Sequence, residues 1–369
     1  MPLCGGYTLE EISITQLQAA YHEGYLNTSQ VVTCFIERIR QTNGWSNSIQ
    51  ETNPDAFLDA TRLDQERANG NIRGPLHGIP YVVKDNIATY GEMETTAGSW
   101  MLMGSKVPRD AFVVSRLRAA GAILLGKATL TEWAHMRSSN LSEGYSARGG
   151  QGRSPYNFTV SPGGSSSGSA VSVAANQCVF SLGTETDGSV MIPAERNALV
   201  GIKPTVGLTS RNGVIPETRH MDTVGVFGRT VKDAALALDG IYGVDPRDSF
   251  TTRQQGKTPE QGFAQFVASK DALRGARFGI PWDSFWALNS PEQNIEIIKI
   301  LGFLTSEGAT VVNGTEIGGK ETLINPTGWD WDWRGKLGFP NESAYTGKPK
   351  PVLLAFRLQK GVKSNVLGF

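Results

Sequence analysis

The sequence predicts an α/β protein built on a β-sheet that contains parallel strands. Apolar segments typical of strands alternate with segments of helical periodicity from about residue 79 to residue 312, and no Pro/Ser-rich linker or charged run separates them. The 369 residues include 43 glycines and are 39% hydrophobic, a composition that favours an enzyme with many tight connections over a disordered or fibrous chain. We therefore expect a single domain over residues 1–345.

The N-terminal part, residues 8–70, is predicted to form a helical layer. Thr8 and Glu11 have the spacing of a capping box, so a first helix is expected to begin there. Thr28 is expected to open a second, amphipathic helix, because VVTCFIERIRQ carries apolar residues near i, i+3 and i+4. The helical layer precedes the strand-rich core.

Residues 79–127 have a strand–helix–strand pattern. The short apolar runs IPYVV and AILLG are predicted strands, and a helix is expected between them, near Ala111 to Ala120, ending at Gly121. This order requires a crossover connection, which favours parallel pairing of the two strands.

The alternation continues toward the C-terminus. VSVAANQ is predicted to be helical, whereas VFSLG, LVGIK, RFGIP and ATVV are predicted strands. Two further helices are marked by capping pairs and a terminal glycine: Thr230 with Asp233 for residues 231–238, and Ser290 with Gln293 and Gly308 for a helix that ends near Ser306.

Charge and cysteine content restrict the classes of partner. The 35 basic and 35 acidic side chains balance, which argues against nucleic acid or an anionic membrane as the ligand and favours a small, largely uncharged molecule. Cys4, Cys34 and Cys178 lack CxxC or Cys/His spacing. We therefore expect three free thiols, with neither a disulfide framework nor a structural zinc site.

Two observations on cellular location point in different directions. The start of the chain lacks a basic region followed by an apolar stretch, and no apolar run is long enough to span a membrane, so a cytoplasmic protein is expected. A secreted protein is the alternative, because five Asn-X-Ser/Thr sequons are present, at Asn27, Asn140, Asn157, Asn313 and Asn341.

The tail, residues 346–369, differs from the rest of the chain. After Tyr345 it is basic and without acidic residues or clear periodicity, so an atypical segment or an ordinary solvated terminus is expected. Its basic residues are Lys348, Lys350, Arg357, Lys360 and Lys363.

The serine-rich segment from Ser161 to Ser189 is the candidate active site. Glycine-rich turns let the backbone approach a substrate closely, and Ser165 and Ser189 are separated by enough chain for a turn, a helix and a strand that return to one sheet edge. The backbone amides of residues 183–189 can form an anion-binding nest for an acyl oxygen. A hydrogen-bonded turn without function is the alternative for this loop.

Lys84 is the candidate base that would activate a serine. It follows the apolar run Tyr81–Val83, where burial would lower the pKa of its ammonium group toward neutrality. A lysine that simply reaches solvent is the alternative, and Lys203 is a rival base at the end of another apolar run. The four histidines, at positions 22, 77, 135 and 220, have no matching serine and acid motif, so we expect structural or surface roles for them.

Gly164–Gly168 also matches G-x-S-x-G, the nucleophile elbow of α/β-hydrolases. That motif requires a strand immediately before it, and Pro162 followed by two glycines makes a poor strand end. We therefore reject an elbow here.

Four motifs in order resemble the amidase signature family, which includes fatty acid amide hydrolase, malonamidase and the amidase subunit of the glutamyl-tRNA amidotransferase. The resemblance covers about residues 70–240, the signature core. Its motifs are LHGIPYVVKDN at Leu76–Asn86, SPGGSSSGS at Ser161–Ser169, GTETDGSVMIPA at Gly183–Ala194 and LVGIKPTVGLTSRNGVIP at Leu199–Pro216.

The resemblance implies the amidase-signature fold, a mixed and mostly parallel sheet covered by helices, together with a Ser-Ser-Lys triad. Lys84 would be the catalytic base, Ser165 the bridging serine after a cis bond from Gly164, and Ser189 the nucleophile that forms an acyl-enzyme. Gly164 would also contact substrate. The backbone amides of Thr186, Asp187, Gly188 and Ser189 would form the oxyanion hole.

The sequence departs from the family pattern in the nucleophile loop and in length. The frequent Asp-Thr-Gly-Gly-Ser-Ile-Arg is replaced by residues 185–191, Glu-Thr-Asp-Gly-Ser-Val-Met, so the Asp–Arg pair of relatives cannot form. Family members usually continue well beyond the point where this chain stops, so an incomplete C-terminal scaffold is expected. Trp329, Trp331 and Trp333 alternate in GWDWDWRG and are candidates for an apolar substrate pocket or, alternatively, for packing at the domain edge.

Three functional hypotheses follow from these residues and the resemblance. The first is an amidase that hydrolyses linear carboxylic amides without a metal or organic cofactor, acting on a small molecule with no nucleic acid or membrane partner and with a homodimer as the expected assembly. The second is a shortened relative that is weakly active or only binds ligands. The third is an ammonia-transferring subunit, which would need partner subunits and tRNA.

Overall fold

The computed structural model describes two compact units. The described residues are 3–138, 140–282, 286 and 289–316, with the backbone alone at 324–325, 328–329 and 353–355. Unit 1 comprises Met1–Val267 and Pro349–Gly361, and unit 2 comprises Ala268–Lys348 and Val362–Phe369. The expectation of one domain over residues 1–345 stays a prediction, since each unit is described by itself.

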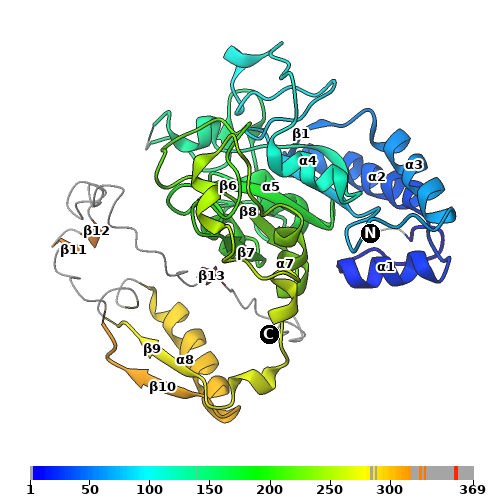
Figure 1. Cartoon of the computed structure of the whole chain (residues 1–369). Helices are drawn as coiled ribbons and strands as arrows, with labels where there is room; N and C mark the ends of the chain where they lie inside the picture. Colours follow the sequence, from blue (N-terminus) through cyan, green and yellow to red (C-terminus); the bar gives the residue numbers. More distant parts are fainter. Residues whose placement is uncertain are drawn as a thin grey trace. The chain divides into compact units, whose positions relative to one another are not determined.

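The helices occur along the whole described chain and are coloured in sequence order in Figure 1. The α-helices are α1 Ile14–His22, α2 Thr28–Ser46, α3 Ala56–Ala68, α4 Phe112–Ala119, α5 Ser167–Ala174, α6 Met191–Arg196, α7 Val231–Asp239 and α8 Pro291–Ser306. Short 3-10 helices are η1 Trp100–Leu102, η2 Glu132–His135, η3 Ser249–Gln254, η4 Ala264–Phe266 and η5 Lys270–Leu273.

The strands of unit 1 form one large sheet in the order β1-β3-β2-β6-β8-β7-β13 and a separate pair, β4 with β5. Their bounds are β1 Ile49–Thr52, β2 Pro80–Lys84, β3 Ile123–Ala128, β4 Tyr145–Ser146, β5 Gly150–Gln151, β6 Phe180–Glu185, β7 Val200–Lys203, β8 Thr223–Gly228 and β13 Leu353–Ala355. The strands of unit 2 are β9 Arg277–Ile280, β10 Thr310–Asn313, β11 Ile324–Asn325 and β12 Gly328–Trp329.

The large sheet is mixed, as expected, but parallel pairs are its minority. β2 pairs parallel with β3, with α4 as the predicted crossover, and parallel with β6 on its other side. The other neighbouring pairs of this sheet are antiparallel. The expectation of a mostly parallel sheet is wrong because β8 inserts between β6 and β7, and the chain reaches β8 from β7 through a loop rather than a crossover helix.

Buried helices fix the two strands that carry the candidate site. α5 is buried along its whole length and packs against β2, β3, β6 and β8. Its small residues allow this close approach: a Cβ on Gly168 would lie 2.4 Å from the Ser48 carbonyl oxygen and 2.5 Å from the Thr129 amide nitrogen. α7 packs against β6, β7 and β8.

The first helix begins later than its capping pair predicts. Glu11 has a φ of 55°, a left-handed conformation that no α-helix continues through, so the capping box expected at Thr8 is wrong. α1 begins at Ile14, where Ser13 and Gln16 form the box. The start of α2 at Thr28 is confirmed, with Asn27 as its N-cap.

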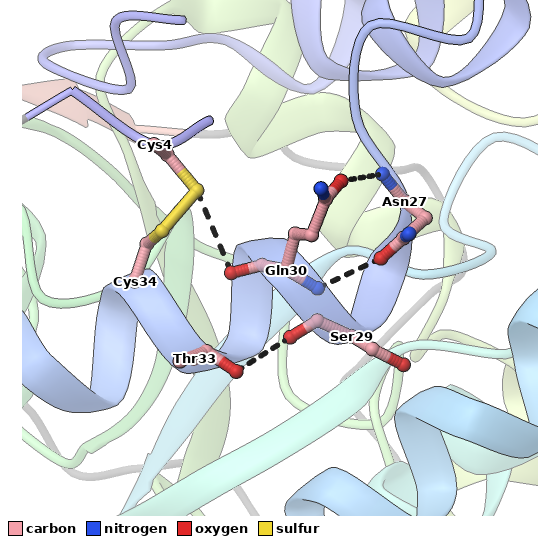
Figure 2. The surroundings of a disulfide bond; sticks show 6 residues. All are labelled: Cys4, Asn27, Ser29, Gln30, Thr33 and Cys34. Atoms are coloured by element: carbon pink, nitrogen blue, oxygen red, sulfur yellow. Dashed lines mark hydrogen bonds between the residues drawn. A yellow bond between two sulfur atoms is a disulfide. The ribbon is translucent and has the colours of Figure 1, made fainter. Parts of the chain in front are cut away.

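The expectation of three free thiols is also wrong. Cys4 and Cys34 form a disulfide with a Cα–Cα distance of 5.9 Å, whereas Cys178 is free and buried. Figure 2 shows Cys4 meeting Cys34 on α2, where the Cys4 sulfur also lies 3.5 Å from the Gln30 carbonyl oxygen. Motif spacing could not reveal this bond, since the N-terminal segment reaches α2 only by folding back in space.

Replacing Cys34 with serine is expected to lower the free energy of unfolding by about 2–4 kcal/mol, because the bond closes a long loop in the unfolded chain. Urea denaturation of the oxidised wild type and the variant measures the difference. Reductant should destabilise the wild type by a similar amount and leave the variant unchanged. Equal stability of the oxidised and reduced wild type would contradict the prediction.

Unit 2 has its own small core. β9 and β10 pair in parallel, α8 lies between them in the chain, and Leu273, Leu304 and Ala309 form a cluster of buried apolar residues. The expected capping box of α8, Ser290 with Gln293, is confirmed. Within the described residues, no helix is both long and apolar enough to cross a lipid bilayer.

Parts of the C-terminal expectations lie outside the described residues. These include Trp331, Trp333 and all of the basic side chains of the tail, while Trp329 is described only as backbone in β12. Within the tail, the backbone of β13 pairs antiparallel with β7. The role of the three tryptophans stays a prediction.

Candidate active site

Lys84 is the last residue of the buried strand β2 and its side chain is fully buried. Its amine nitrogen lies 2.7 Å from the Ser165 hydroxyl oxygen. It also donates to the Thr184 hydroxyl at 2.8 Å and to the Thr184 carbonyl oxygen at 3.2 Å. The alternative of a lysine reaching solvent is excluded, because the whole side chain points into the junction between β2 and β6.

Ser165 lies in the loop before α5, and the Gly164–Ser165 peptide bond is cis, as the resemblance implies. The Ser165 carbonyl oxygen accepts from the Thr131 amide at 3.0 Å, which holds the loop against the end of β3. Gly164 is required there because a Cβ would lie 2.6 Å from the Thr131 hydroxyl oxygen. A contact of Gly164 with substrate stays a prediction.

Ser189 follows strand β6 and is almost fully buried, with 7% of its surface exposed. The Ser166 amide donates to the Ser189 carbonyl oxygen at 3.2 Å, so the two serine-rich loops meet as expected. Gly188 has a φ of 128°, which favours glycine at the residue before Ser189. Lys84, Ser165 and Ser189 therefore come from the ends of neighbouring elements at one edge of the sheet.

Glu185 organises the loop that is expected to bind an oxyanion. One of its carboxylate oxygens accepts from the Val190 amide at 2.6 Å and from the Met191 amide at 2.9 Å. Burial raises the pKa of this carboxyl, and the amides of Met191, Val190 and Gly188 oppose that rise together with Lys203. The Glu185 carboxylate thus binds backbone amides of the loop that contains Ser189, in a sequence where the Asp–Arg pair implied by the resemblance is missing. The sequence pattern identifies the missing pair but not this replacement.

Glu217 and Asp222 are site residues that the sequence does not predict. Both line a small cavity next to Thr184 and Thr186, with Arg211 on the same wall. Asp222 accepts from the Thr186 hydroxyl at 2.7 Å and from the Glu217 amide at 2.8 Å, so it joins the β6 loop to the chain that enters β8. These contacts connect segments that are distant in the sequence, and no local motif signals them.

The site contains a lysine and a carboxyl group whose pKa values approach each other. Burial lowers the pKa of Lys84 to about 7, against the opposing effect of nearby carboxylates, first of all Glu217. Burial raises the pKa of Glu217 to about 7, and Lys84 is the first group that opposes the rise. A neutral amine at position 84 is therefore available near neutral pH.

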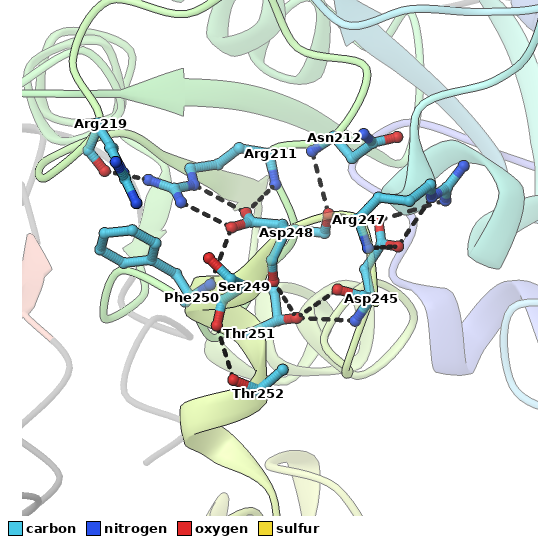
Figure 3. Close-up of polar contacts among 12 residues, drawn as sticks. Arg211, Asn212, Arg219, Asp245, Arg247, Asp248, Ser249, Phe250, Thr251 and Thr252 are labelled. Atoms are coloured by element: carbon cyan, nitrogen blue, oxygen red, sulfur yellow. Dashed lines mark hydrogen bonds and ion pairs between the residues drawn. The ribbon is translucent and has the colours of Figure 1, made fainter.

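A network of ion pairs holds the chain segment that carries Glu217 (Figure 3). The Arg211 guanidinium donates to both carboxylate oxygens of Asp248, at 2.9 and 2.7 Å, and also to the Arg219 carbonyl oxygen. The Phe250 ring lies under Arg211, with 4.4 Å between the guanidinium carbon and the ring centroid. The Arg211 charge is thus paired with Asp248, whereas the acidic residues that line the cavity are Glu185, Glu217 and Asp222.

A second buried lysine lies next to the site but is not part of it. Lys127 on β3 lies 4.0 Å from the Asp85 carboxylate, and both side chains are fully buried. Asp85 also accepts from the Thr96 hydroxyl at 2.6 Å and from the Gly98 amide at 2.9 Å. This network anchors the residue that follows Lys84 and thereby the end of β2.

The remaining candidates are separated from the triad. Lys203 ends β7 and is half-buried, as expected for a strand-ending lysine. His77 is buried and hydrogen-bonded to the Leu63 carbonyl oxygen, whereas His22 and His220 are exposed. His135 ends η2, in which Trp133 and Ala134 have left-handed backbone conformations. No strand lies immediately before the G-x-S-x-G match, because residues 161–163 have no regular structure, so the segment lacks the strand that an elbow requires.

Glu217→Gln is expected to shift the acid limb of the pH profile of kcat/KM to lower pH. The substitution removes a negative charge that raises the pKa of Lys84, so the amine loses its proton at a lower pH. The measurement is kcat/KM for one amide substrate across pH 5–9, a range of about two units on either side of neutrality. Glu23→Gln, at an exposed carboxylate after α1, is the matched control and should leave the limb in place. An acid limb that moves to higher pH, or that stays in place, would contradict the effect of Glu217 on the pKa of Lys84.

The arrangement has the parts of a serine-based acyl transfer site. A buried amine contacts one serine hydroxyl, and a second serine lies in a glycine-containing loop after a strand. Among the described residues, no group of three or more His, Cys, Asp or Glu side chains is placed to hold a metal ion.

Comparisons with known proteins place this arrangement in a family. A family model described as Amidase matches residues 30–316. A Schizosaccharomyces pombe protein named as an amidase is 52% identical over 94% of this chain and 59% of its own length. An Arabidopsis thaliana protein, also named as an amidase, is 43% identical over 88% of this chain and 62% of its own length.

The fold is shared with solved structures. The peptide amidase of Stenotrophomonas maltophilia superposes with a TM-score of 0.75 at 41% identity, and the match covers 83% of this chain and 62% of that chain. The present chain therefore spans about three fifths of the length of the relatives that it matches. The amidase-signature fold expected from the sequence is confirmed.

Proposed function

The chain belongs to the amidase family, and from this membership we propose that it hydrolyses a carboxylic amide to the acid and an amine or ammonia through an acyl intermediate on Ser189. The observation that carries the proposal is the 2.7 Å contact between the Lys84 amine and the Ser165 hydroxyl in a fully buried setting. Thr184 supports it, since its two oxygens accept the two N–H donors of a neutral amine. The nitrogen lone pair is then available to Ser165.

Acylation uses this relay. The neutral Lys84 amine takes the Ser165 proton as Ser165 takes the proton of Ser189, and the Ser189 oxygen attacks the amide carbonyl carbon. Negative charge develops on the carbonyl oxygen, where the amides of residues 186–189 stabilise it. As the C–N bond breaks, Ser165 gives a proton to the departing nitrogen and takes one back from the Lys84 ammonium, which leaves Lys84 neutral for the next stage.

Deacylation repeats the relay with water. Water loses a proton to the Ser165–Lys84 pair and attacks the ester carbonyl, the ester C–O bond breaks, and Ser189 regains its proton while the acid leaves. The reaction needs no redox step. Glu185 contributes indirectly, because it fixes the amides of the nucleophile loop from inside the fold.

The proposed substrate is a small amide, with no nucleic acid involved. The structurally similar enzyme from Stenotrophomonas maltophilia is named a peptide amidase, which supports including peptide amides among the candidate substrates. A homodimer stays a prediction.

The function is tested by assays of amide hydrolysis with short aliphatic, aromatic, long-chain and peptide amides, reading acid and amine release together. A serine-reactive fluorophosphonate probe reports the nucleophile independently of substrate choice. Stoichiometric labelling with hydrolysis of at least one amide class is the expected result. A folded protein that neither labels nor hydrolyses any amide would instead support a noncatalytic, ligand-binding relative.

A further inference from the structure

The proposed amide hydrolysis gives no role to the Asn-X-Ser/Thr sequons of this chain. Four of the five lie in the described residues, and they differ in how the asparagine and its hydroxyl partner are used. At Asn157 the side-chain carbonyl oxygen accepts from the Thr159 amide at 2.9 Å and from the Thr159 hydroxyl at 2.7 Å. Both bonds use the side-chain oxygen of Asn157, so the side-chain nitrogen takes no part in this turn.

The segment around Asn157 is accessible. Residues 156–160 are all exposed, including the apolar side chains of Tyr156, Phe158 and Val160. Phe158 is 56% exposed although its ring packs at 5.2 Å from Trp45. A run of exposed apolar side chains beside an exposed asparagine is a surface that a bound oligosaccharide would cover.

At two other sequons, the hydroxyl of the serine or threonine donates to a group other than the sequon asparagine. At Asn27 the carbonyl oxygen caps α2 by accepting from the Gln30 amide, and the Ser29 hydroxyl donates to Asp64 at 2.6 Å (Figure 2 shows the cap). At Asn313 the Thr315 hydroxyl donates to the Val312 carbonyl oxygen at 3.1 Å. Within the described part of the chain, Asn157 is the sequon whose own hydroxyl binds the asparagine carbonyl.

The disulfide is a second and independent observation. Cys4 and Cys34 are joined across 30 residues, and such bonds form and persist in oxidising compartments rather than in the cytosol. Their formation removes two electrons and two protons from the thiols, which a disulfide donor accepts by thiol–disulfide exchange. In eukaryotic cells N-linked glycans are added in the same oxidising environment.

We infer that this chain matures in an oxidising secretory compartment, where Cys4 and Cys34 are joined and Asn157 receives an N-linked oligosaccharide. The donor is a lipid diphosphate-linked oligosaccharide. The Asn157 amide nitrogen attacks the first sugar carbon and loses one proton, a C–N bond forms, and the bond between that carbon and the diphosphate oxygen breaks. The alternative of a secreted protein is thus favoured over a cytoplasmic location.

Translation of the full chain behind a cleavable secretory leader, in the presence of microsomes, tests the modification whether or not the product is later secreted. The wild type is expected to carry a glycan at Asn157, detected by glycopeptide mass spectrometry and removed by an N-glycosidase. Asn157→Gln and Thr159→Ala should abolish occupancy at this position. Thr159→Ser, which retains the hydroxyl, should preserve it.

An unoccupied Asn157 in the translocated wild type would overturn the inference. So would an Asn157 that remains glycosylated in Thr159→Ala, because the threonine hydroxyl would then have no role. Both readouts are independent of amide hydrolysis, so they fail or succeed separately from the proposed function.

The compartment is tested by comparing the chain produced in a reducing cytosol and in the secretory pathway of one host. Alkylation of the denatured, unreduced protein should modify Cys178 alone in the secreted product and all three cysteines in the cytosolic one. After enzymatic deglycosylation the secreted product should melt at the higher temperature, and Cys4→Ser should remove the difference. Three reactive thiols in the secreted product, or equal melting temperatures, would contradict the inference.

Discussion

Replacing Ser189 with alanine is expected to lower kcat for amide hydrolysis by on the order of 10⁶, the loss observed when a serine hydrolase loses its nucleophile. Without the hydroxyl, no acyl-enzyme can form, whereas the proposed oxyanion hole, the amides of residues 186–189, would still stabilise charge on the carbonyl oxygen. Residual hydrolysis above the rate in water should therefore persist. Labelling by the fluorophosphonate probe should be lost completely.

Ser166→Ala is the matched control for Ser189→Ala. Ser166 is the central serine of the G-x-S-x-G match and is buried like Ser189, but its hydroxyl donates to the Thr184 carbonyl oxygen at 3.0 Å. We expect this variant to retain probe labelling with a modest loss of stability, because it removes two buried hydrogen bonds, the one to the Thr184 carbonyl oxygen and the one from the Thr184 amide, worth about 1 kcal/mol each. Labelling that survives in Ser189→Ala and disappears in Ser166→Ala would show that the nucleophile lies in the other loop.

The order of strands and helices is predictable wherever the pattern is local. The starts of α7 and α8 follow from capping residues and that of α2 from apolar periodicity, whereas β2, α4 and β3 follow from apolar runs around a helix. β8 is not predicted from the sequence, because its segment DTVGVFG contains glycines, which weaken a strand pattern. Gly225 is needed there, since a Cβ would lie 2.5 Å from the Ile202 carbonyl oxygen of the neighbouring strand β7.

In the candidate site, the contact between Lys84 and Ser165 is predictable, whereas the residues around them are not. Lys84 and Ser165 lie in motifs of consecutive residues, and their contact is expected from the sequence. Glu217 and Asp222 reach the site only through the pairing of β6 with β8, which brings two distant loops together. The contact of Cys4 with α2 likewise depends on how the N-terminal segment folds back onto this helix, which the spacing of the cysteines in the sequence does not reveal.

Lys84→Met is expected to lower kcat/KM by on the order of 10⁴, at the upper end of what general acid–base catalysis contributes. Methionine keeps an unbranched chain of similar length in the buried site but cannot accept a proton, so Ser165 and Ser189 keep their protons. Probe labelling should slow to a similar degree, since the probe also depends on an activated Ser189. Lys203→Met, which removes the half-buried rival lysine at the end of β7, should retain kcat/KM.

The Lys84→Arg variant distinguishes two possible roles of Lys84, a base that accepts a proton and a fixed positive charge. Arginine stays protonated at all accessible pH values, so it would restore activity if the site needed only a cation and would not if it needs a proton acceptor. We expect Lys84→Arg to be as inactive as Lys84→Met, while wild-type kcat/KM rises with pH through about 7 as the Lys84 amine becomes neutral. Thermal unfolding of both variants shows whether the fold survives. Recovery of activity in the arginine variant, or a wild-type profile that falls through this pH range, would contradict the role of a neutral lysine.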